Sequence, residues 1–345
     1  MGQIKNQIKS LILIGLLFFC NSLSAKEHSD SDSEGSFNPG DIITHHIGDS
    51  HEWHFATIGE QHITLPLPVI LYSKDRGLEV FSSSNLAHGH SYMGYSLDSH
   101  DHIVSEDASR SVYDFSITKN VASLFISAFL LLTIFIGIGN SYKSNPNQAP
   151  KGIQSFFEPI IIYVRDSIAK DVIGPKYEKY LPYLLTIFFF IWFNNLLGLV
   201  PGGANLTGNI AVTLFLALVT FFVTNFSGNK YYWSHIFNTP GVPVLLKPLI
   251  VPIEIVGLFT KPFSLMVRLF ANITAGHIII LSLLSLIFIF KHVAASLVSL
   301  PFALFMSFLE LFVALLQAYI FTLLSAMYIA SATEEHHAPD HDYGH

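Results

Sequence analysis

The stretch that decides the fold is KPFSLMVRLFANITAGHIII, residues 261–280. Its apolar residues are dense enough for a lipid bilayer, yet Arg268 stands in the middle of them. An arginine at the centre of a membrane helix costs ~2.5–3.5 kcal/mol to insert. It also keeps its proton, so it cannot avoid that cost by becoming neutral. The rest of the sequence has to supply a reason for this charge.

Charged residues are scarce over the whole chain and almost missing from its second half. They make up 12% of the 345 residues, against about 25% in an ordinary soluble domain. Between residues 181 and 332 the formal charges are Lys230, Lys247, Glu254, Lys261, Arg268, Lys291 and Glu310. This distribution indicates an integral membrane protein.

Five apolar stretches are expected to cross the membrane as helices: residues 121–139, 181–200, 209–226, 262–290 and 301–330. A helix needs ~20 residues to cross upright, so the last two are predicted to be tilted. We expect these two to form a long helical hairpin that turns near residue 293. Residues 242–259 are also apolar, but three prolines interrupt them, and they are predicted to form a separate lead-in helix at the membrane. The predicted fold class is therefore all-α, with five transmembrane helices.

The first 25 residues have the layout of a cleaved signal peptide. Lys5 and Lys9 precede a short apolar run over residues 11–20, and small residues lead to Ala25. Cys20 offers lipoprotein attachment as an alternative, although the bulky Phe19 before it argues against this. Cleavage after Ala25 leaves a chain without cysteine and hence without a disulfide.

Residues 26–120 are predicted to form a polar exported extension, strand-like in places such as HITLPLPVILYS. Ten of the 17 histidines lie between His28 and His102, in runs such as HHIGDSHEWH. One interpretation is a metal-binding region. The other is a solvated extension of biased composition, because the spacings match no defined ligand set. No metal ligands or cofactors are predicted.

Positive charge in the short loops predicts the orientation. The connection over residues 141–180 carries six Lys or Arg residues, whereas residues 201–208, PGGANLTG, carry none. The positive-inside rule therefore puts the first connection in the cytoplasm. An exported amino terminus and five crossings then leave the carboxyl terminus in the cytoplasm as well, so the two criteria agree.

Polar residues in the last two apolar stretches, Arg268 among them, are expected to pair across the hairpin by depth. Snorkelling to the headgroups is one alternative for Arg268, since it lies only about 10 Å along a helix from Lys261. Asn272, however, follows it on the same helix face. In an antiparallel hairpin, residues at equal depth have a constant sum of numbers. Arg268 with Gln317 gives 585 and His277 with Glu310 gives 587, so two polar layers are predicted.

The two layers differ in chemistry. An acid beside a histidine in a partly dry environment can exchange a proton near neutral pH, which suits a relay. A simple interhelical hydrogen bond is the alternative for His277 and Glu310. Arg268 stays charged, and would force a mobile carboxylate to ionise as it passes. Arg268 and His277 are nine residues apart, which puts them on opposite sides of the helix. They are therefore expected to act as two separate sites that do not contact each other.

Several motifs resemble one family. RLFANITAGH, PIE (252–254), KPFSLMVRLF and LLQAYIFTLLSAMYIASATEEHH are similar to subunit a of the F-type ATP synthase membrane sector. GIQSFFEPIIIYVRDSIAKDVIG (152–174) and NNLLGLVPG (194–202) add to the resemblance, which covers roughly residues 121–335. Many bacterial relatives carry Glu at the position of His277 and His at that of Glu310, so this chain looks like an exchanged pair.

The resemblance implies a non-catalytic proton-channel subunit of the bacterial inner membrane. Arg268 would face the carboxylate of a rotating c-subunit ring, with Asn272 and Gln317 as polar neighbours. Two aqueous half-channels would feed the ring through the His277/Glu310 path, so that proton flow drives rotation and ATP synthesis. The implied partners are the c-ring, the b subunits of the peripheral stalk and the remaining subunits of the synthase, with no nucleic acid.

The predicted organisation is a signal peptide (1–25), a periplasmic His-rich extension (26–120), a membrane domain (121–335) and a cytoplasmic tail (336–345). A membrane hydrolase is a poorer alternative, because the chain has neither G-x-S-x-G nor H-E-x-x-H. A metal or ion transporter that uses the His-rich extension as a collector is the second alternative. A metal transporter would need more acidic or histidine ligands within the membrane than His277 and Glu310.

Overall fold

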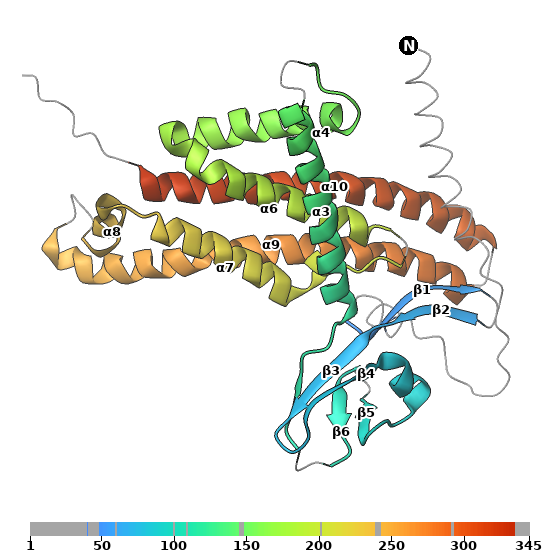
Figure 1. Ribbon diagram of the computed structural model, residues 1–345. Coiled ribbons are helices and arrows are strands. Elements are labelled where there is room, and N and C mark those ends of the chain that lie inside the picture. The colour runs from blue at the N-terminus through green and yellow to red at the C-terminus, as the bar shows by residue number, and fades with distance from the viewer. Residues whose placement is uncertain are drawn as a thin grey trace, which may run out of the picture.

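The computed structural model describes residue 40 and residues 48–334, apart from short gaps at 59–60, 99–100, 108–109, 145–147, 201, 239–242 and 291–292. The predicted signal peptide, the start of the His-rich run HHIGDSHEWH (residues 45–47) and the predicted cytoplasmic tail lie outside the described residues. The described chain has a strand-rich part, residues 48–118, followed by a helical part (Figure 1).

The strand-rich part contains three small antiparallel sheets. Its strands are β1 (Glu52–Ile58), β2 (Gln61–Pro66), β3 (Pro68–Ser73), β4 (Gly77–Ser82), β5 (Tyr95–Leu97), β6 (Ile103–Ser105) and β7 (Val112–Asp114). β1 pairs with β2, β3 lies between β4 and β7, and β5 pairs with β6. Alternate residues of β3, Val69 and Leu71, are fully buried, as expected for a strand with one face on a core. The strands predicted at HITLPLPVILYS are present as β2 and β3, so the all-α class applies only to the helical part that follows.

The helical part begins with α3 (Lys119–Ser144) and α4 (Ile153–Tyr163), which continues through a π-helical turn, η2 (Val164–Lys170). Then come α6 (Tyr177–Gly198), α7 (Ile210–Phe226), α8 (Lys230–Phe237), α9 (Lys247–Phe290) and α10 (Val293–Thr333). Among the described residues, four stretches are long and apolar enough to cross a membrane: Lys119–Ser144, Ile153–Gly198, Lys247–Phe290 and Ala295–Thr333. A fifth is reached only if α7 and α8, bent by 103°, count as one span.

The structure corrects two boundaries. Residues 247–259 are not a separate lead-in helix, because α9 runs unbroken for 44 residues through Pro252 and Pro262. Prolines are tolerated within membrane helices because neighbouring groups satisfy the freed carbonyls. α10 likewise begins at Val293 and contains Pro301, instead of starting at residue 301. The break between α9 and α10 falls at residues 291–292, next to the turn predicted near residue 293.

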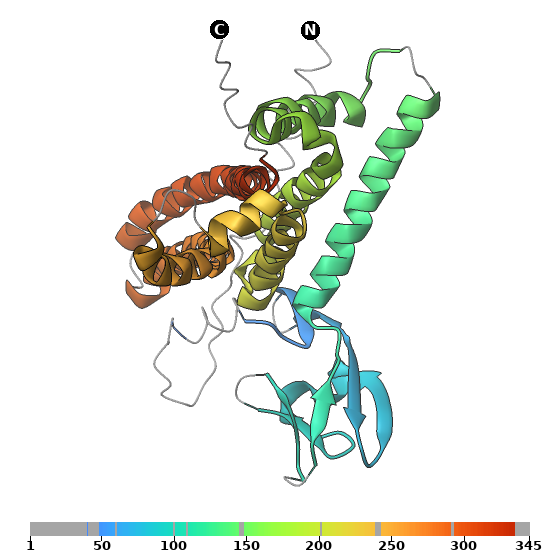
Figure 2. The same cartoon turned by 90° about the vertical axis from the view of Figure 1, so that its left-hand side faces the viewer.

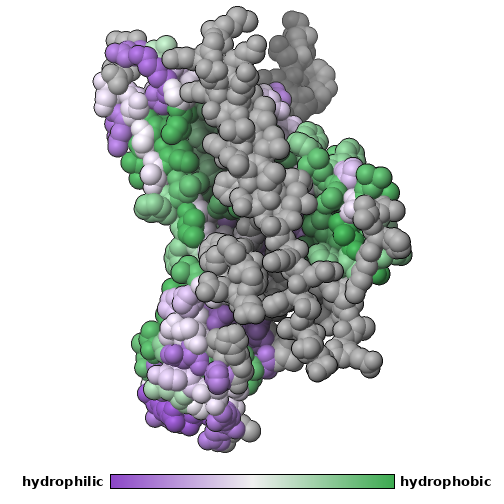
Figure 3. Space-filling view, turned by 90° about the vertical axis from the view of Figure 1, so that its right-hand side faces the viewer, coloured by the Kyte–Doolittle hydropathy of each residue, from purple (hydrophilic) through white to green (hydrophobic). Residues whose placement is uncertain are grey.

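The long helices form a layered bundle across the direction of α3 (Figures 1 and 2). α9 and α10 lie side by side as an antiparallel hairpin, with α6 packed on α10 and α7 packed on α9. α3 crosses and contacts α6, and it leads down to the strand-rich part. Figure 3 shows apolar side chains over the helices and mostly polar ones over the strand-rich part. This contrast matches a membrane-embedded bundle with a solvated extension.

An ion pair between buried His51 and partly exposed Asp114 links the segment before β1 to β7. The His51 ring lies 3.1 Å through Nδ1 from the carbonyl oxygen of Asp101 and 3.0 Å through Nε2 from Asp114 Oδ2. Burial acts to lower the pKa of His51, but the hydrogen bond and charge of Asp114 outweigh it and raise that pKa above 6.5. Burial acts to raise the pKa of Asp114, but hydrogen bonds from His51 and Ser116 lower it to about 2. Both groups are therefore charged in the folded protein at mildly acidic pH.

The strand-rich part is expected to be most stable between about pH 4 and pH 6.5. The raised pKa of His51 contributes stability that is lost as pH rises through its folded value. The lowered pKa of Asp114 contributes stability that is lost as pH falls towards 2. Amide exchange of the β3–β4 hairpin, corrected for its intrinsic pH dependence, should therefore be slowest in this window.

Asp114→Asn should flatten that profile, while the matched control Glu106→Gln, at an exposed carboxylate, should leave it unchanged. A wild-type profile with no minimum, or one retained in Asp114→Asn, would contradict the assignment.

Candidate functional site

The α9–α10 hairpin brings together four of the five predicted site residues in two contacts. Asn272 Nδ2 donates to Gln317 Oε1 at 2.9 Å, and the His277 ring contacts the Glu310 carboxyl through Nδ1. The residue numbers of the two pairs sum to 589 and 587, so both pairs obey the depth rule of an antiparallel hairpin. The two predicted polar layers are therefore present in the geometry.

The His277–Glu310 contact is closely packed and largely shielded from solvent. Glu310 is 5% exposed, and its carboxyl reaches over Gly276 on the facing helix. A Cβ at position 276 would lie 2.9 Å from Glu310 Oε1. Glycine is therefore needed for the carboxyl to reach the ring at this depth.

A third helix completes the environment of His277. Its Nε2 lies 3.2 Å from the carbonyl oxygen of Gly198 at the end of α6. A carbonyl oxygen can only accept, so Nε2 carries a hydrogen and donates it. Nδ1 is then the nitrogen that shares or exchanges a proton with Glu310. The arrangement can pass one proton between a carboxyl and an imidazole without moving the backbone.

The second layer differs from the prediction in its pairing. Gln317 was expected opposite Arg268, but its bond is to Asn272, one helical turn further along α9. Gln317 is 1% exposed, and among the described residues its Nε2 has no hydrogen-bond partner. It therefore presents a buried donor beside the face that carries Arg268.

Arg268 itself is half-buried. Within the described part of the chain, no hydrogen-bond acceptor or carboxylate pairs with its guanidinium. Small side chains that are exposed in this chain flank it on α9: Ser264, Ala271 and Ala275. Such a stripe lets another helix approach closely. The charge and its open, small-residue face together fit an acidic group carried by another molecule.

Residues of α6 and the following loop were not predicted as site residues. Asn195 Nδ2 donates to the Ala314 carbonyl at 3.1 Å, and its Oδ1 accepts from the Thr207 hydroxyl at 2.7 Å. Neighbouring Asn194 is 1% exposed, and its Oδ1 has no partner among the described residues. The signal in the sequence was the asparagine doublet within an apolar span, since amides at membrane depth are costly unless they are paired.

Metal binding finds no support in the described residues. No group of three or more His, Cys, Asp or Glu side chains lies close enough to hold an ion there. The described histidines of HHIGDSHEWH include His51, whose two ring nitrogens face a carbonyl and a carboxylate of the protein. His51 is thus engaged in the fold.

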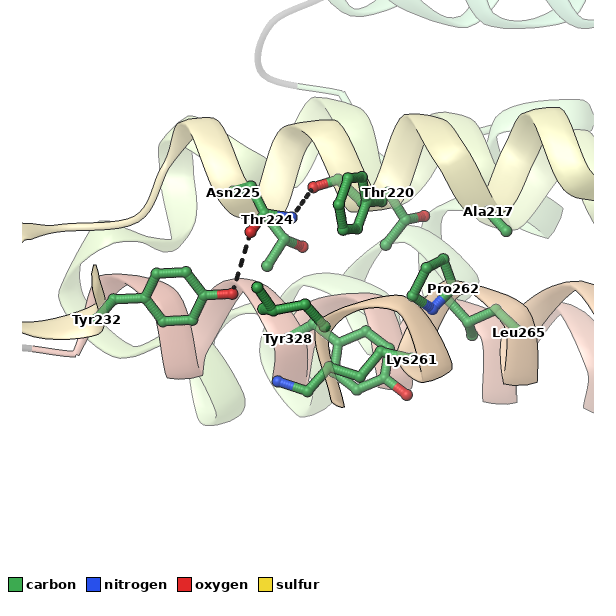
Figure 4. A pocket seen from close by; sticks show the side chains of 11 residues that line it. Ala217, Thr220, Thr224, Asn225, Tyr232, Lys261, Pro262, Leu265 and Tyr328 are labelled. Carbon is green, nitrogen blue, oxygen red and sulfur yellow. Dashed lines mark hydrogen bonds between the residues drawn. The ribbon is translucent and has the colours of Figure 1, made fainter. Parts of the chain in front are cut away.

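A pocket between α7, α8, α9 and α10 lies apart from these residues (Figure 4). Its walls are mainly apolar, with Tyr232 donating to Asn225 Oδ1 at 3.3 Å and the Lys261 ammonium 5.5 Å from the centre of the Tyr328 ring. None of the five predicted site residues lines it. It carries no acid–base pair, so the chemistry belongs to the hairpin contacts.

Comparison with known proteins covers both parts of the chain. Residues 121–330 match the family described as ATP synthase A chain. Residues 42–124 match a domain described as a domain of unknown function, DUF8433. Over 314 residues the chain is 45% identical to ATP synthase subunit a 2 of Chlorobaculum tepidum, covering 89% of this chain and 76% of the relative.

Two further relatives cover less of the chain. ATP synthase subunit a of Chloroherpeton thalassium is 50% identical over 239 residues, 68% of this chain and 71% of the relative. That of Myxococcus xanthus is 45% identical over 240 residues, 67% of this chain and 78% of the relative. The family match over most of the helical part and these identities show that the chain belongs to the ATP synthase subunit a family, a family of non-catalytic, multi-pass membrane subunits.

Proposed function

We propose that the chain is the proton-channel stator subunit of a bacterial F-type ATP synthase. It works beside a c-subunit ring and is held by the b subunits of the peripheral stalk. Two aqueous half-channels bring protons to and from the ring, and Arg268 separates them. Proton flow then drives ring rotation and ATP synthesis on partner subunits.

The observation that carries this proposal is the unpaired Arg268 guanidinium. Leaving a charge without a counter-charge in a membrane is costly, yet no described residue of the chain pairs with it. A carboxylate on each passing c subunit supplies the missing partner. Because arginine stays protonated, it favours the ionised carboxylate and so makes that carboxylate release its proton on approach.

The His277–Glu310 pair supplies the other half of the mechanism. Its geometry allows a proton to move between Glu310 and His277 Nδ1 while Nε2 stays bonded to Gly198. Buried polar atoms without described partners, Asn194 Oδ1 and Asn205 Nδ2, lie on α6 and the loop beside it. Such atoms bind water readily. They support an aqueous outer path that ends at the relay pair.

The orientation follows from the charges and the fold. Residues 141–180, which include the connection between α3 and α6, carry six basic residues. This connection lies on one side of the bundle, while the strand-rich part lies on the opposite side (Figure 1). The positive-inside rule assigns the basic side to the cytoplasm. The strand-rich part then lies in the periplasm, and the carboxyl terminus in the cytoplasm.

Arg268→Ala should abolish ATP-driven proton pumping, because nothing then forces the passing carboxylate to ionise. The complex should still assemble, since Arg268 has no described partner to lose. Pumping is measured in inverted membrane vesicles with a pH-sensitive dye, beside Lys261→Ala as a control on the same helix. Coupled pumping retained in Arg268→Ala would overturn the proposed role.

His277→Glu combined with Glu310→His should restore pumping better than either single change. The double variant returns one acid and one base to the same layer, whereas each single variant leaves two acids or two histidines facing each other. The measurement is the pumping rate of the four proteins at matched assembly. A double variant no better than the worse single variant would contradict a coupled relay.

A further inference from the structure

Residues 49–53 of the strand-rich part, DSHEW, contact the helical part at two places. In the first, Asp49 accepts hydrogen bonds from the Asn120 backbone N–H at 3.1 Å and the Thr118 hydroxyl at 2.8 Å. The backbone N–H of Lys119 also donates to the Ser50 carbonyl at 2.9 Å. A carboxylate at a helix amino terminus satisfies free N–H groups and favours the helix dipole. This contact fixes DSHEW to the start of α3.

The second contact reaches the loop between α6 and α7. Trp53 Nε1–H donates to the carbonyl oxygen of Gly202 at 2.6 Å. The Trp53 side chain is 7% exposed and packs in a cluster with Leu67 and Ala204. Burial of an indole together with its hydrogen bond is typical of a specific anchor. Trp53 of the strand-rich part thus binds the loop at residues 202–204 through a hydrogen bond and apolar packing.

Backbone hydrogen bonds and close contacts join that loop to the end of α6. Gly203 N–H donates to the Val200 carbonyl at 2.7 Å, and Leu199 N–H lies 3.2 Å from the Asn195 carbonyl. A Cβ at position 203 would lie 2.1 Å from the Leu197 carbonyl oxygen, so this turn allows only glycine. Gly198, whose carbonyl accepts from His277 Nε2, lies at the start of this turn. These contacts give a route by which a displacement of Gly202 and Gly203 would reach the end of α6 and its Gly198 carbonyl.

We propose that Trp53 is a positioning residue for the proton relay: by holding the turn at Gly202 it fixes the Gly198 carbonyl that orients His277. The strand-rich part is then a clamp on the outer end of the relay. This inference rests on the proposed function of the His277–Glu310 pair, and it assigns a role to the part of the chain that matches a domain of unknown function.

The groups around His277 make its orientation sensitive to this clamp. From α10 it faces Glu310, and from α6 it faces the Gly198 carbonyl. Among the described residues, Glu310 is the titratable side chain in contact with it. If the Gly198 carbonyl withdraws, Nε2 loses its acceptor and the ring is free to present either nitrogen to Glu310. The proton exchange then loses its fixed direction.

The first test is local and independent of proton transport. Trp53→Phe keeps an aromatic ring and removes the N–H donor, while Trp233→Phe on α8 is the matched control. In the assembled complex, amide exchange of the peptide spanning residues 198–209 should rise about tenfold in Trp53→Phe, the value of one hydrogen bond, and stay unchanged in Trp233→Phe. Leu67→Ala, which loosens the same cluster, should act in the same direction. Unchanged exchange in both Trp53→Phe and Leu67→Ala would overturn the clamp.

The second test measures proton transfer through the His277–Glu310 pair. Passive proton conduction through the membrane sector is measured in vesicles as a function of outer pH. In Trp53→Phe its pH midpoint should shift to lower pH, because the imidazole then lacks one acceptor for its N–H groups. Faster loop exchange with an unchanged midpoint, or the same shift in Trp233→Phe, would overturn the positioning role. Arg268→Ala, tested in parallel, reports separately on the proposed function, since its failure would leave the exchange result intact.

Discussion

Polar side chains inside a membrane must find partners, and this constraint organises the whole helical part. Lipid offers no hydrogen bonds, so every buried amide or carboxyl that is left alone costs free energy. The chain meets the requirement helix by helix: Asn272 pairs with Gln317 and His277 with Glu310. Asn195 of α6 ties the loop to α10 through Thr207 and Ala314. Some buried amide atoms, such as Gln317 Nε2 and Asn194 Oδ1, have no partner among the described residues. Arg268 is the case that carries a full charge, and the proposed partner for it lies on another subunit.

The same constraint decides how much of the site can be predicted from the sequence. Equal depth in an antiparallel hairpin follows from residue numbers alone, so the sequence is enough to pair His277 with Glu310. It is not enough to choose between Arg268 and Asn272 as the partner of Gln317, because that choice depends on helix rotation within one turn. The sequence also cannot predict the Gly198 carbonyl as the acceptor for His277, since a backbone carbonyl leaves no signature in a sequence. The continuity of α9 through its two prolines also escapes prediction, because prolines that end helices in water are tolerated in a bilayer.

The strand-rich part is predicted from the sequence only as a solvated extension with an undefined role. Short strands such as β5 to β7 have three residues each, too few for a reliable pattern, and their pairing is non-local. The segment DSHEW belongs to a histidine-rich run in the sequence. It nevertheless carries a helix cap, the buried histidine of an ion pair and the indole that reaches the loop. The indole contact links the strand-rich part directly to the loop that follows Gly198, whose carbonyl accepts from His277.

The central claim is that the small-residue face around Arg268 receives another subunit that carries a carboxylate. The most direct measurement is a disulfide cross-link from Ala271→Cys, made in a Cys20→Ser background, to cysteines placed along the c subunit. The account predicts a cross-link close to the c-subunit carboxylate, and none from Leu297→Cys, an exposed position near the start of α10. Failure of Ala271→Cys to link to any c-subunit position in the assembled complex, under conditions that link other known neighbours, would contradict it.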